Sequence, residues 1–243
     1  MKEVEKLVEA FPDNPDYLEF MIEMYESAGK TSDLPRLYEK LLEIAPDDPR
    51  AQLAVADYYF RLGRDDEAKP LLEKAFANEQ MDISPKLTFL MLNYIKSNRG
   101  DESQLENLLG MMIAAHPENA RAYAFRADYY NSKGKKNKAL EDYKKALEHE
   151  KSMQVLWQKV ITLNLGMGNY REAAGTADEA LDYFPNDASL YYYKGMAYNL
   201  DKQYQKAVDA LENGLGYVID RPEMEFRFYS TLGEAYNSLK KYE

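Results

Sequence analysis

The chain has 243 residues, of which 45% are hydrophobic and 30% charged, so it holds enough apolar material for a packed core and lacks the composition of a disordered segment. Its 31 Lys and Arg residues stand against 42 Asp and Glu residues, and the net charge of −11 disfavours phosphate backbones and anionic membrane surfaces as partners. The absence of cysteine excludes disulfides, thiol nucleophiles and thiolate metal sites, and no apolar run approaches the roughly 18 residues of a transmembrane helix.

The spacing of the prolines reveals a sequence repeat. The numbers of Pro12 and Pro46 differ by 34, and those of Pro117 and Pro185 differ by 68, which is twice that period. The numbers of Pro46 and Pro117 differ by 71, which exceeds two periods by three. We therefore expect a short insertion between these two prolines, and we place it at residues 82–85, ahead of the third repeat.

Each period contains two amphipathic helical patterns joined by a short turn, and no segment has the alternating pattern of a strand. The expected first helices cover residues 15–28, 49–62, 85–98, 119–133, 153–167 and 187–201. The expected second helices cover residues 33–44, 66–79, 102–115, 136–149, 170–183 and 204–217. A glycine, which reaches the left-handed region without a steric cost, follows most first helices. These glycines are Gly29, Gly63, Gly100, Gly134 and Gly168.

Two second helices contain a proline close to their expected starts. Pro35 and Pro70 are both expected within the first turn, where backbone N–H groups have no intrahelical acceptor. Asp33 and Asp66 precede these prolines, and we predict that their side chains cap the two helices.

Each end of the sequence contains half of a repeat. Residues 3–11 have the apolar spacing of a second helix, and residues 222–242 have that of a first helix. Because repeat units bury their apolar faces only against neighbours, we expect a segment of a longer protein that can self-associate through its ends. Native capping helices are the alternative, with the N-terminus as the stronger case. The expected N-terminal loss and the lack of cysteine favour an exported or periplasmic bacterial protein over a cytoplasmic one.

Certain residue types recur at the same place in each period. In the fifth repeat they are Trp157, Gly168, Ala173, Ala180 and Pro185. These positions resemble the tetratricopeptide repeat, whose signature runs from a bulky aromatic residue through Leu-Gly, Tyr and Ala to a closing Pro. The resemblance covers essentially the whole chain and implies an all-α fold, a right-handed α-solenoid that forms one domain over residues 1–243. The full repeats are expected near residues 15–48, 49–82, 86–119, 120–153, 154–187 and 188–221, with partial repeats at 1–14 and 222–243.

The resemblance also implies a function. In proteins similar to this family the first helices line a concave groove that holds a peptide, so we expect a non-catalytic scaffold that binds a protein or peptide segment. Tyrosine and methionine suit such recognition because they combine a large contact area with low-entropy or adaptable side chains. The alternative is that exposed tyrosines only cover apolar stems. The candidate groove residues are Phe20, Glu23, Asp57, Met91, Tyr94, Arg121, Phe125, Asp128, Asn131, Lys159, Tyr192, Tyr193 and Met196.

One subtype of the family holds a C-terminal carboxylate with Lys, Asn and Arg side chains on successive first helices. At the corresponding places this sequence has Glu19 and Glu23 in the first repeat and Ala54 in the second. A count that starts at the fourth repeat finds Ala124 and Asp128. The carboxylate-binding set is therefore absent, and the acidic first repeat favours a ligand with basic character.

Little in the sequence points to catalysis, and we expect no enzyme activity, metal site or cofactor. His116 and His149 fall near the ends of second helices, where an imidazole complements the helix dipole. No zinc, calcium or phosphate-binding motif is present. The lysines between residues 133 and 145 fall on a turn and a solvated helix face, so nucleic acid is not an expected partner. Two alternatives stay open, namely an arm that packs against other domains of its own full-length chain, or part of an enzyme.

Overall fold

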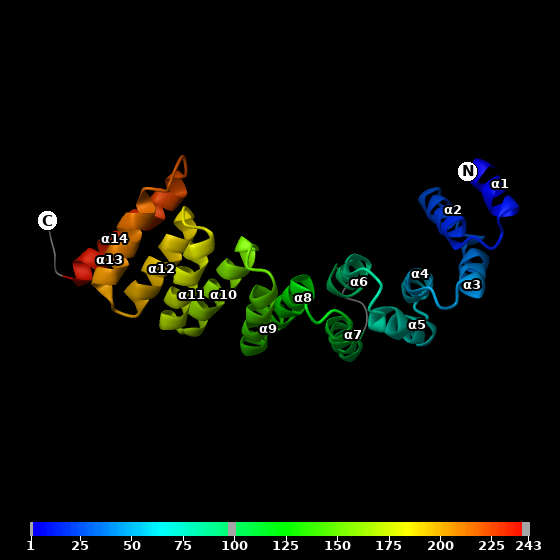
Figure 1. Cartoon of the computed structure of the whole chain (residues 1–243), viewed down its shortest axis with the longest axis horizontal. Helices are drawn as coiled ribbons and strands as arrows, with labels where there is room; N and C mark the ends of the chain where they lie inside the picture. The colour runs from blue at the N-terminus through cyan, green and yellow to red at the C-terminus, as the bar shows by residue number, and fades with distance from the viewer. Residues whose placement is uncertain (1, 97–100, 240–243) are drawn as a thin grey trace. The chain divides into compact units, whose positions relative to one another are not determined.

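The computed structural model describes residues 2–96 and 101–239, and these residues form helices and turns without a strand (Figure 1). The chain divides into two compact units, Met1–Pro117 and Glu118–Glu243, called unit 1 and unit 2 below. Helices that are adjacent or nearly adjacent in sequence pack against each other within each unit, which confirms the predicted all-α solenoid fold. The extension of one solenoid over both units stays a prediction, and Gly100 lies outside the described residues.

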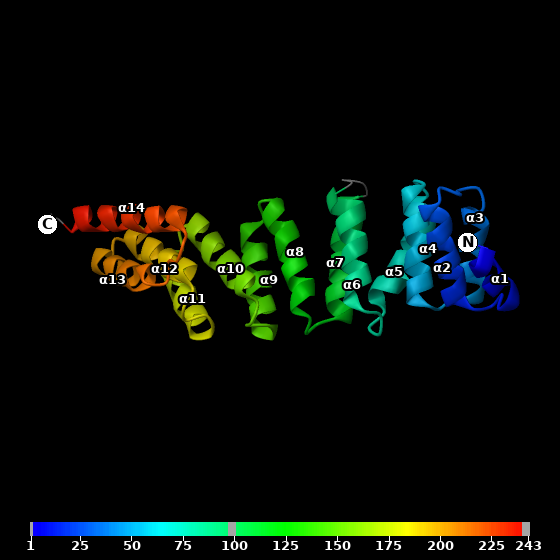
Figure 2. The same cartoon turned by 90° about the horizontal axis from the view of Figure 1, so that it is seen from above.

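The described part of unit 1 contains one leading helix followed by three helix pairs. The first helices of two neighbouring repeats, α2 and α4, lie side by side in Figure 2 and are joined by an ion pair between Glu26 and Arg61. The core includes Leu18, Leu41 and Val55, all fully buried, and the rings of Tyr38 and Tyr58 stack at 4.3 Å between centroids. The elements are α1 Lys2–Ala10, α2 Pro15–Ser27, α3 Leu34–Ile44, α4 Pro49–Arg61, α5 Asp65–Ala77, α6 Ile83–Leu90, the π-helix η1 Met91–Lys96, and α7 Glu102–Ala115.

The described part of unit 2 contains three further pairs and a final longer helix. Two glycines let the last of these helices approach each other closely. A Cβ added at Gly195 would lie 2.4 Å from Leu211 Cγ, and one added at Gly214 would lie 2.3 Å from Tyr191 Cβ, so only glycine permits this packing. The elements are α8 Ala120–Ser132, α9 Lys136–His149, α10 Gln154–Met167, α11 Tyr170–Tyr183, α12 Ala188–Leu200, α13 Tyr204–Leu215 and α14 Pro222–Ser238.

The turn after a first helix has the same backbone conformation in both units. Gly29, Gly63, Gly134 and Gly168 have φ values of 68°, 73°, 71° and 81°, in the left-handed region that the sequence predicts. Lys202 occupies the equivalent place in the sixth repeat and has a φ of 61°. A side chain costs about 1 kcal/mol in this region, so the geometry of the repeat overrides the local preference of Lys202.

The insertion lies inside the third repeat rather than ahead of it. α4 begins at Pro49 and α6 begins at Ile83, one full period later, so the repeat is still in phase at this point. The starts of α6 and α7 are 19 apart in sequence number, whereas the starts of α4 and α5 are 16 apart, as are those of α8 and α9. The extra residues therefore fall between residues 83 and 102, and the prediction that they precede the helix is wrong.

A π-helix takes up part of this insertion. Hydrogen bonds in a π-helix run from residue i to residue i+5, and the wider turn brings residues five apart to the same side. The rings of Phe89 and Tyr94 accordingly contact each other, with 6.1 Å between their centroids. Asn93 stabilises the turn, because its side-chain amide donates to the Phe89 carbonyl at 3.2 Å and to Asp57 Oδ1 on α4 at 2.7 Å.

Two predictions about helix starts are wrong. α5 begins at Asp65, so Asp66 lies inside the helix instead of capping it, and Pro70 lies in the helix interior beyond the first turn. Asp33 does precede α3, but its side chain makes no capping hydrogen bond. Pro35 falls at the second position of α3, which confirms its placement in the first turn.

Candidate functional site

The candidate groove residues of unit 1 lie on first helices, and three of them are well exposed. Phe20 is 51% exposed, Met91 is 39% exposed, and Glu23 is also exposed. Asp57 is half-buried. These side chains are available to a ligand on the first-helix side of unit 1.

Tyr94 differs from the other candidates because it is buried. It is 5% exposed, and its hydroxyl has no hydrogen-bond partner among the described residues. Burial raises the pKa of this hydroxyl. The prediction of Tyr94 as a groove residue is wrong, because the wide turn of η1 directs its ring into the core beside Phe89.

The candidates of unit 2 are distributed over three first helices, α8, α10 and α12. Tyr192 and Tyr193 contact each other at 5.8 Å between ring centroids, and Tyr192 also contacts Phe228 of α14 at 5.5 Å. Part of the Tyr192 ring therefore serves helix packing. Of the full set, the exposed members are Arg121, Asp128 and Asn131, and the half-buried members are Phe125, Lys159, Tyr192, Tyr193 and Met196.

Polar side chains link neighbouring first helices in unit 1. Arg50 on α4 lies 3.3 Å from Asp16, at the equivalent place one period earlier on α2. The guanidinium of Arg61 on α4 pairs with Glu26 on α2, with 2.6 Å between Nη2 and Oε1. It also pairs with Asp57 on its own helix, with 3.0 Å between Nε and Oδ2. Exposed pairs of this kind contribute little stability individually. They connect the two first helices, and they leave the candidate residue Asp57 with a partner of its own.

Unit 2 has equivalent links. Asp128 on α8 pairs with Lys159 on α10 and accepts a hydrogen bond from the Tyr143 hydroxyl on α9. Burial and the Asp128 carboxylate raise the pKa of that hydroxyl. Asn199 on α12 donates to Glu234 on α14 at 3.2 Å. Two of the candidate charges, Asp128 and Lys159, therefore neutralise each other, and the exposed ring surfaces offer a ligand more than these charges do.

A pocket of about 520 Å³ opens between α4 and α6 in unit 1. Its wall contains Leu53, Met81 and Phe89, which are 7%, 5% and 4% exposed. Arg50 and Asp57 also line it, and both are engaged by the partners described above. A concave and mostly apolar surface with a few polar groups is the usual form of a ligand pocket.

Two residues of this pocket, Thr88 and Leu92, were not predicted from the sequence. Leu92 is 50% exposed and Thr88 is also exposed, whereas Leu90, which a helix starting at residue 85 would direct outward, is fully buried. Thr88 lies one full period after Ala54, which lines the same pocket. An unbroken count from the second repeat would have identified Thr88, but not Leu92 beyond the wide turn.

One side of α2 is acidic. Asp16, Glu19, Glu23 and Glu26, called the acidic face below, are spaced by three or four residues and so lie on one side of the helix. Glu26 accepts a hydrogen bond from the Tyr38 hydroxyl at 2.9 Å. Glu19 Oε1 is buried without a hydrogen-bond partner among the described residues, and burial raises the pKa of its carboxyl group.

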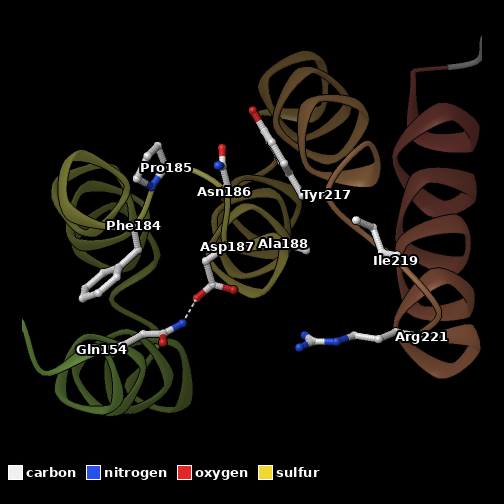
Figure 3. A pocket seen from close by; sticks show the side chains of 9 residues that line it. All are labelled: Gln154, Phe184, Pro185, Asn186, Asp187, Ala188, Tyr217, Ile219 and Arg221. Carbon is white, nitrogen blue, oxygen red and sulfur yellow. Dashed lines mark hydrogen bonds between the residues drawn. The ribbon is translucent and has the colours of Figure 1, made fainter.

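A second pocket, of about 510 Å³, lies in unit 2 where the ends of several helices meet (Figure 3). Gln154 at the start of α10 donates to Asp187, which caps α12 by accepting from the Ser189 backbone N–H at 2.8 Å. Ile219 and Arg221, on the turn between α13 and α14, extend toward the same space, and Ile219 is 74% exposed. An amide, a carboxylate and a guanidinium beside aliphatic surface can bind a ligand, but they do not form an acid–base or nucleophile arrangement.

Lys86 on α6 is a buried charge that the sequence did not reveal. It is fully buried, and its ammonium donates to the carbonyls of Phe76 at 3.1 Å and Asn78 at 2.6 Å, next to the end of α5. The third contact is with His116 Nε2 at the end of α7, at 2.8 Å. Burial lowers the pKa of Lys86 to about 8, and burial and the neighbouring ammonium lower the pKa of His116. A neutral His116 accepts the third proton, so this contact joins α5, α6 and α7.

The described residues show no arrangement typical of an active site. No group of three or more His, Asp or Glu side chains among them could hold a metal ion. No helix in this part of the chain is long and apolar enough to cross a membrane. His149 stacks on Tyr123 at 5.6 Å between ring centroids. The surfaces described above are suited to binding.

Three family models for the tetratricopeptide repeat match the sequence, over residues 36–85, 120–151 and 162–216. Together these matches cover more than half of the chain. The unmatched residues 86–119 contain η1 and the insertion that interrupts the period. A comparison with curated proteins found no match.

Solved structures with a similar fold share little sequence with this chain. Yeast Tom70 is 17% identical, with 98% of this chain and 50% of that chain covered and a TM-score of 0.53, so this chain spans about half of its length. YrrB, described as a TPR protein with an unusual peptide-binding site, is 14% identical, with coverages of 93% and 97% and a TM-score of 0.46. The first TPR of Spaghetti, bound to an HSP90 peptide, is 16% identical, with coverages of 51% and 95% and a TM-score of 0.45. At these identities the likeness concerns the fold alone.

Proposed function

Because the chain belongs to the tetratricopeptide repeat family, whose repeats are generally non-catalytic interaction modules, we propose that it is a scaffold that binds a protein or peptide segment along its first helices. The observation that carries this proposal is the pocket between α4 and α6. It is concave and apolar, and two first helices form it, on the side where the family resemblance predicts a ligand.

Unit 2 supports the same function with a different surface. Phe125, Tyr192, Tyr193 and Met196 are half-buried on its first helices, so part of each side chain remains accessible. Aromatic and Met side chains give large contact areas, and the cost of ordering an aromatic ring is low. These residues are the proposed contact surface for a segment that reaches unit 2.

The partner is proposed to have basic character where it meets unit 1. Residues 1–117 carry 13 Lys and Arg against 23 Asp and Glu, whereas residues 118–243 carry 18 against 19. Nearly all of the net negative charge therefore belongs to unit 1. Complementary charge directs a partner to one surface and excludes others more than it raises affinity.

Selection of a random peptide library against the whole chain tests this function. We expect enriched peptides that bind as synthetic peptides in fluorescence anisotropy. Tyr192→Ala with Tyr193→Ala in unit 2, and Leu92→Ser in unit 1, should between them weaken every selected peptide while circular dichroism stays helical. Tyr183→Ala, which alters a 47% exposed tyrosine on the second helix α11, is the matched control. The proposal fails if no peptide binds, or if the control weakens binding as much as the first-helix variants do.

A further inference from the structure

We propose that the pocket between α4 and α6 is an anchor pocket for one apolar side chain of a basic segment, whose Lys or Arg residues lie against the acidic face of α2. The anchor pocket is defined by Leu53, Ala54, Thr88, Phe89 and Leu92. This inference rests on the proposed function and adds to it the position and the chemical class of the ligand.

The pocket favours an apolar side chain because its charged groups already have partners. Arg50 is paired with Asp16 at 3.3 Å, and Asp57 accepts from Asn93 at 2.7 Å and pairs with Arg61. What remains for a ligand is the buried wall and the exposed edge at Leu92. The volume of about 520 Å³ falls within the usual range for a ligand site, which is roughly 300–1,000 Å³.

The pocket occurs where the chain departs from its own repeat. The π-helix η1 follows α6 directly, and the Asn93 side chain joins this wide turn to Asp57 of the pocket wall by a hydrogen bond. Leu92 is thereby held at the surface while its neighbours Asn93 and Tyr94 are buried. A π-helix interrupts the regular α-helical backbone and is frequently found at functional sites. Its presence beside the pocket agrees with a role of the pocket in recognition.

The acidic face adjoins the anchor pocket through Arg50. This side chain lines the pocket and contacts Asp16 of the acidic face, so the two surfaces are continuous within unit 1. Glu23 is exposed, and the buried Glu19 Oε1 has no hydrogen-bond partner among the described residues. A ligand cation beside the half-buried Glu19 would favour the ionised carboxylate, which burial disfavours. The excess of acidic residues in unit 1 adds a negative potential that attracts a cationic ligand from a longer distance.

Three synthetic peptides test the inference against the whole chain. The first carries a single Leu among Lys and Ser residues, the second has Ala in place of this Leu, and the third has Glu in place of each Lys. We expect the Ala peptide to bind about tenfold or more weakly, because burial of a Leu side chain accounts for at least that factor. The Glu peptide should not bind, and the binding of the Leu peptide should weaken as salt is added. Absence of binding by the Leu peptide, or equal binding of the Leu and Ala peptides, overturns the inference.

Variants of the chain then locate the anchor. Thr88→Trp fills the pocket from an exposed position, and we expect it to weaken the Leu peptide about tenfold while the Ala peptide binds as before. This loss of difference between the two peptides is a coupling that a general loss of structure would not produce. Thr162→Trp, at an exposed threonine of α10 in unit 2, is the matched control. Leu92→Ser is an independent test, because it removes exposed apolar surface without adding bulk. We expect it also to weaken the binding of the Leu peptide.

The outcomes separate the two proposals. If library peptides bind and respond to Tyr192→Ala with Tyr193→Ala but not to Thr88→Trp or Leu92→Ser, the anchor pocket is rejected and the proposed function rests on the first-helix surface of unit 2 alone. If no library peptide binds, both proposals fail.

Discussion

Buried charge is treated differently in the two units. In unit 2, Asp142 on α9 is 2% exposed and accepts two hydrogen bonds of 2.7 Å from the guanidinium of Arg126 on α8. In unit 1, Lys86 is equally buried, but its three contacts are two carbonyls and the His116 imidazole, without a carboxylate. A two-point contact between opposite charges stabilises a buried ion more than neutral acceptors do.

The units also differ in the regularity of their repeats. Unit 2 keeps the repeat period from α8 to α12 and packs its last helices through Gly195 and Gly214. Unit 1 contains η1, and two of its polar atoms, Glu19 Oε1 and the Tyr94 hydroxyl, are buried without partners among the described residues, against one in unit 2, Asn164 Nδ2. Local features that disagree with the global pattern are expected at functional or strained sites. This comparison places the stable framework in unit 2 and the specialised surface in unit 1, and three substitution experiments test it.

The largest effect is expected from the close packing of unit 2. Gly214→Ala places a Cβ 2.3 Å from Tyr191 Cβ and 2.9 Å from the Phe228 ring, and we expect a loss of about 3 kcal/mol in the free energy of unfolding. The control in unit 1 is Gly110→Ala in the middle of α7, where a Cβ would meet nothing within 4 Å. It should stabilise by about 0.5–1 kcal/mol, because alanine loses less backbone entropy than glycine on folding. Denaturant unfolding followed by circular dichroism measures both, and similar values for the two variants would contradict the contrast.

Removal of each buried charge gives the next effect. Asp142→Ala leaves the half-buried Arg126 without its carboxylate and should destabilise by about 2 kcal/mol. Lys86→Met keeps a similar shape and removes a charge that has no carboxylate partner. The substitution loses three hydrogen bonds, but it also removes the cost of burying an ammonium group. Because these two contributions oppose each other, we expect a change below about 1 kcal/mol in the free energy of unfolding. The same denaturation curves measure the pair, and a larger loss for Lys86→Met would show that Lys86 is a principal stabilising contact.

The third expected effect is a pH dependence of unit 1. The pKa of Lys86 is about 8 in the folded chain against 10.5 for a solvated lysine, so the unfolded chain binds more protons between these values and stability rises with pH across this window. The lowered pKa of His116 acts on the acid side, where stability falls as the pH drops below 6.5. The difference between 10.5 and about 8 corresponds to at most about 3 kcal/mol across the alkaline window. Thermal unfolding at a series of pH values should show the alkaline rise in the wild type and not in Lys86→Met, and an identical pH profile of both proteins would refute it.

Much of this architecture could be predicted because the residues that mark the repeat period lie outside the helices. Prolines and turn glycines set the frame, and the repeat geometry holds even at Lys202, where the local residue disfavours it. The prolines showed the size of the insertion but not its place, because Pro46 and Pro117 only bracket the interval.

Within that interval the candidate site was predicted less well. Tyr94 is buried although the sequence predicted it in the groove, and Leu92 is exposed, because the wide turn of η1 has no marker in the side-chain pattern. The burial of Lys86 could not be predicted from the sequence either. A lysine on a helix is normally solvated, and the three neutral acceptors around it come from residues 8 to 30 positions away.

The uneven distribution of charge also has a kinetic consequence. Residues 1–117 contain 23 acidic and 13 basic residues, whereas residues 118–243 contain 19 acidic and 18 basic ones. At physiological ionic strength a charge acts over about 8 Å, so the field of unit 1 draws in a cationic segment before any side chain is in contact. The frequency of productive encounters with such a segment would then depend on salt more steeply than the lifetime of the complex, which apolar contacts determine. Ionic strength would thus set how soon a partner is captured, and the apolar contacts would set how long it is kept.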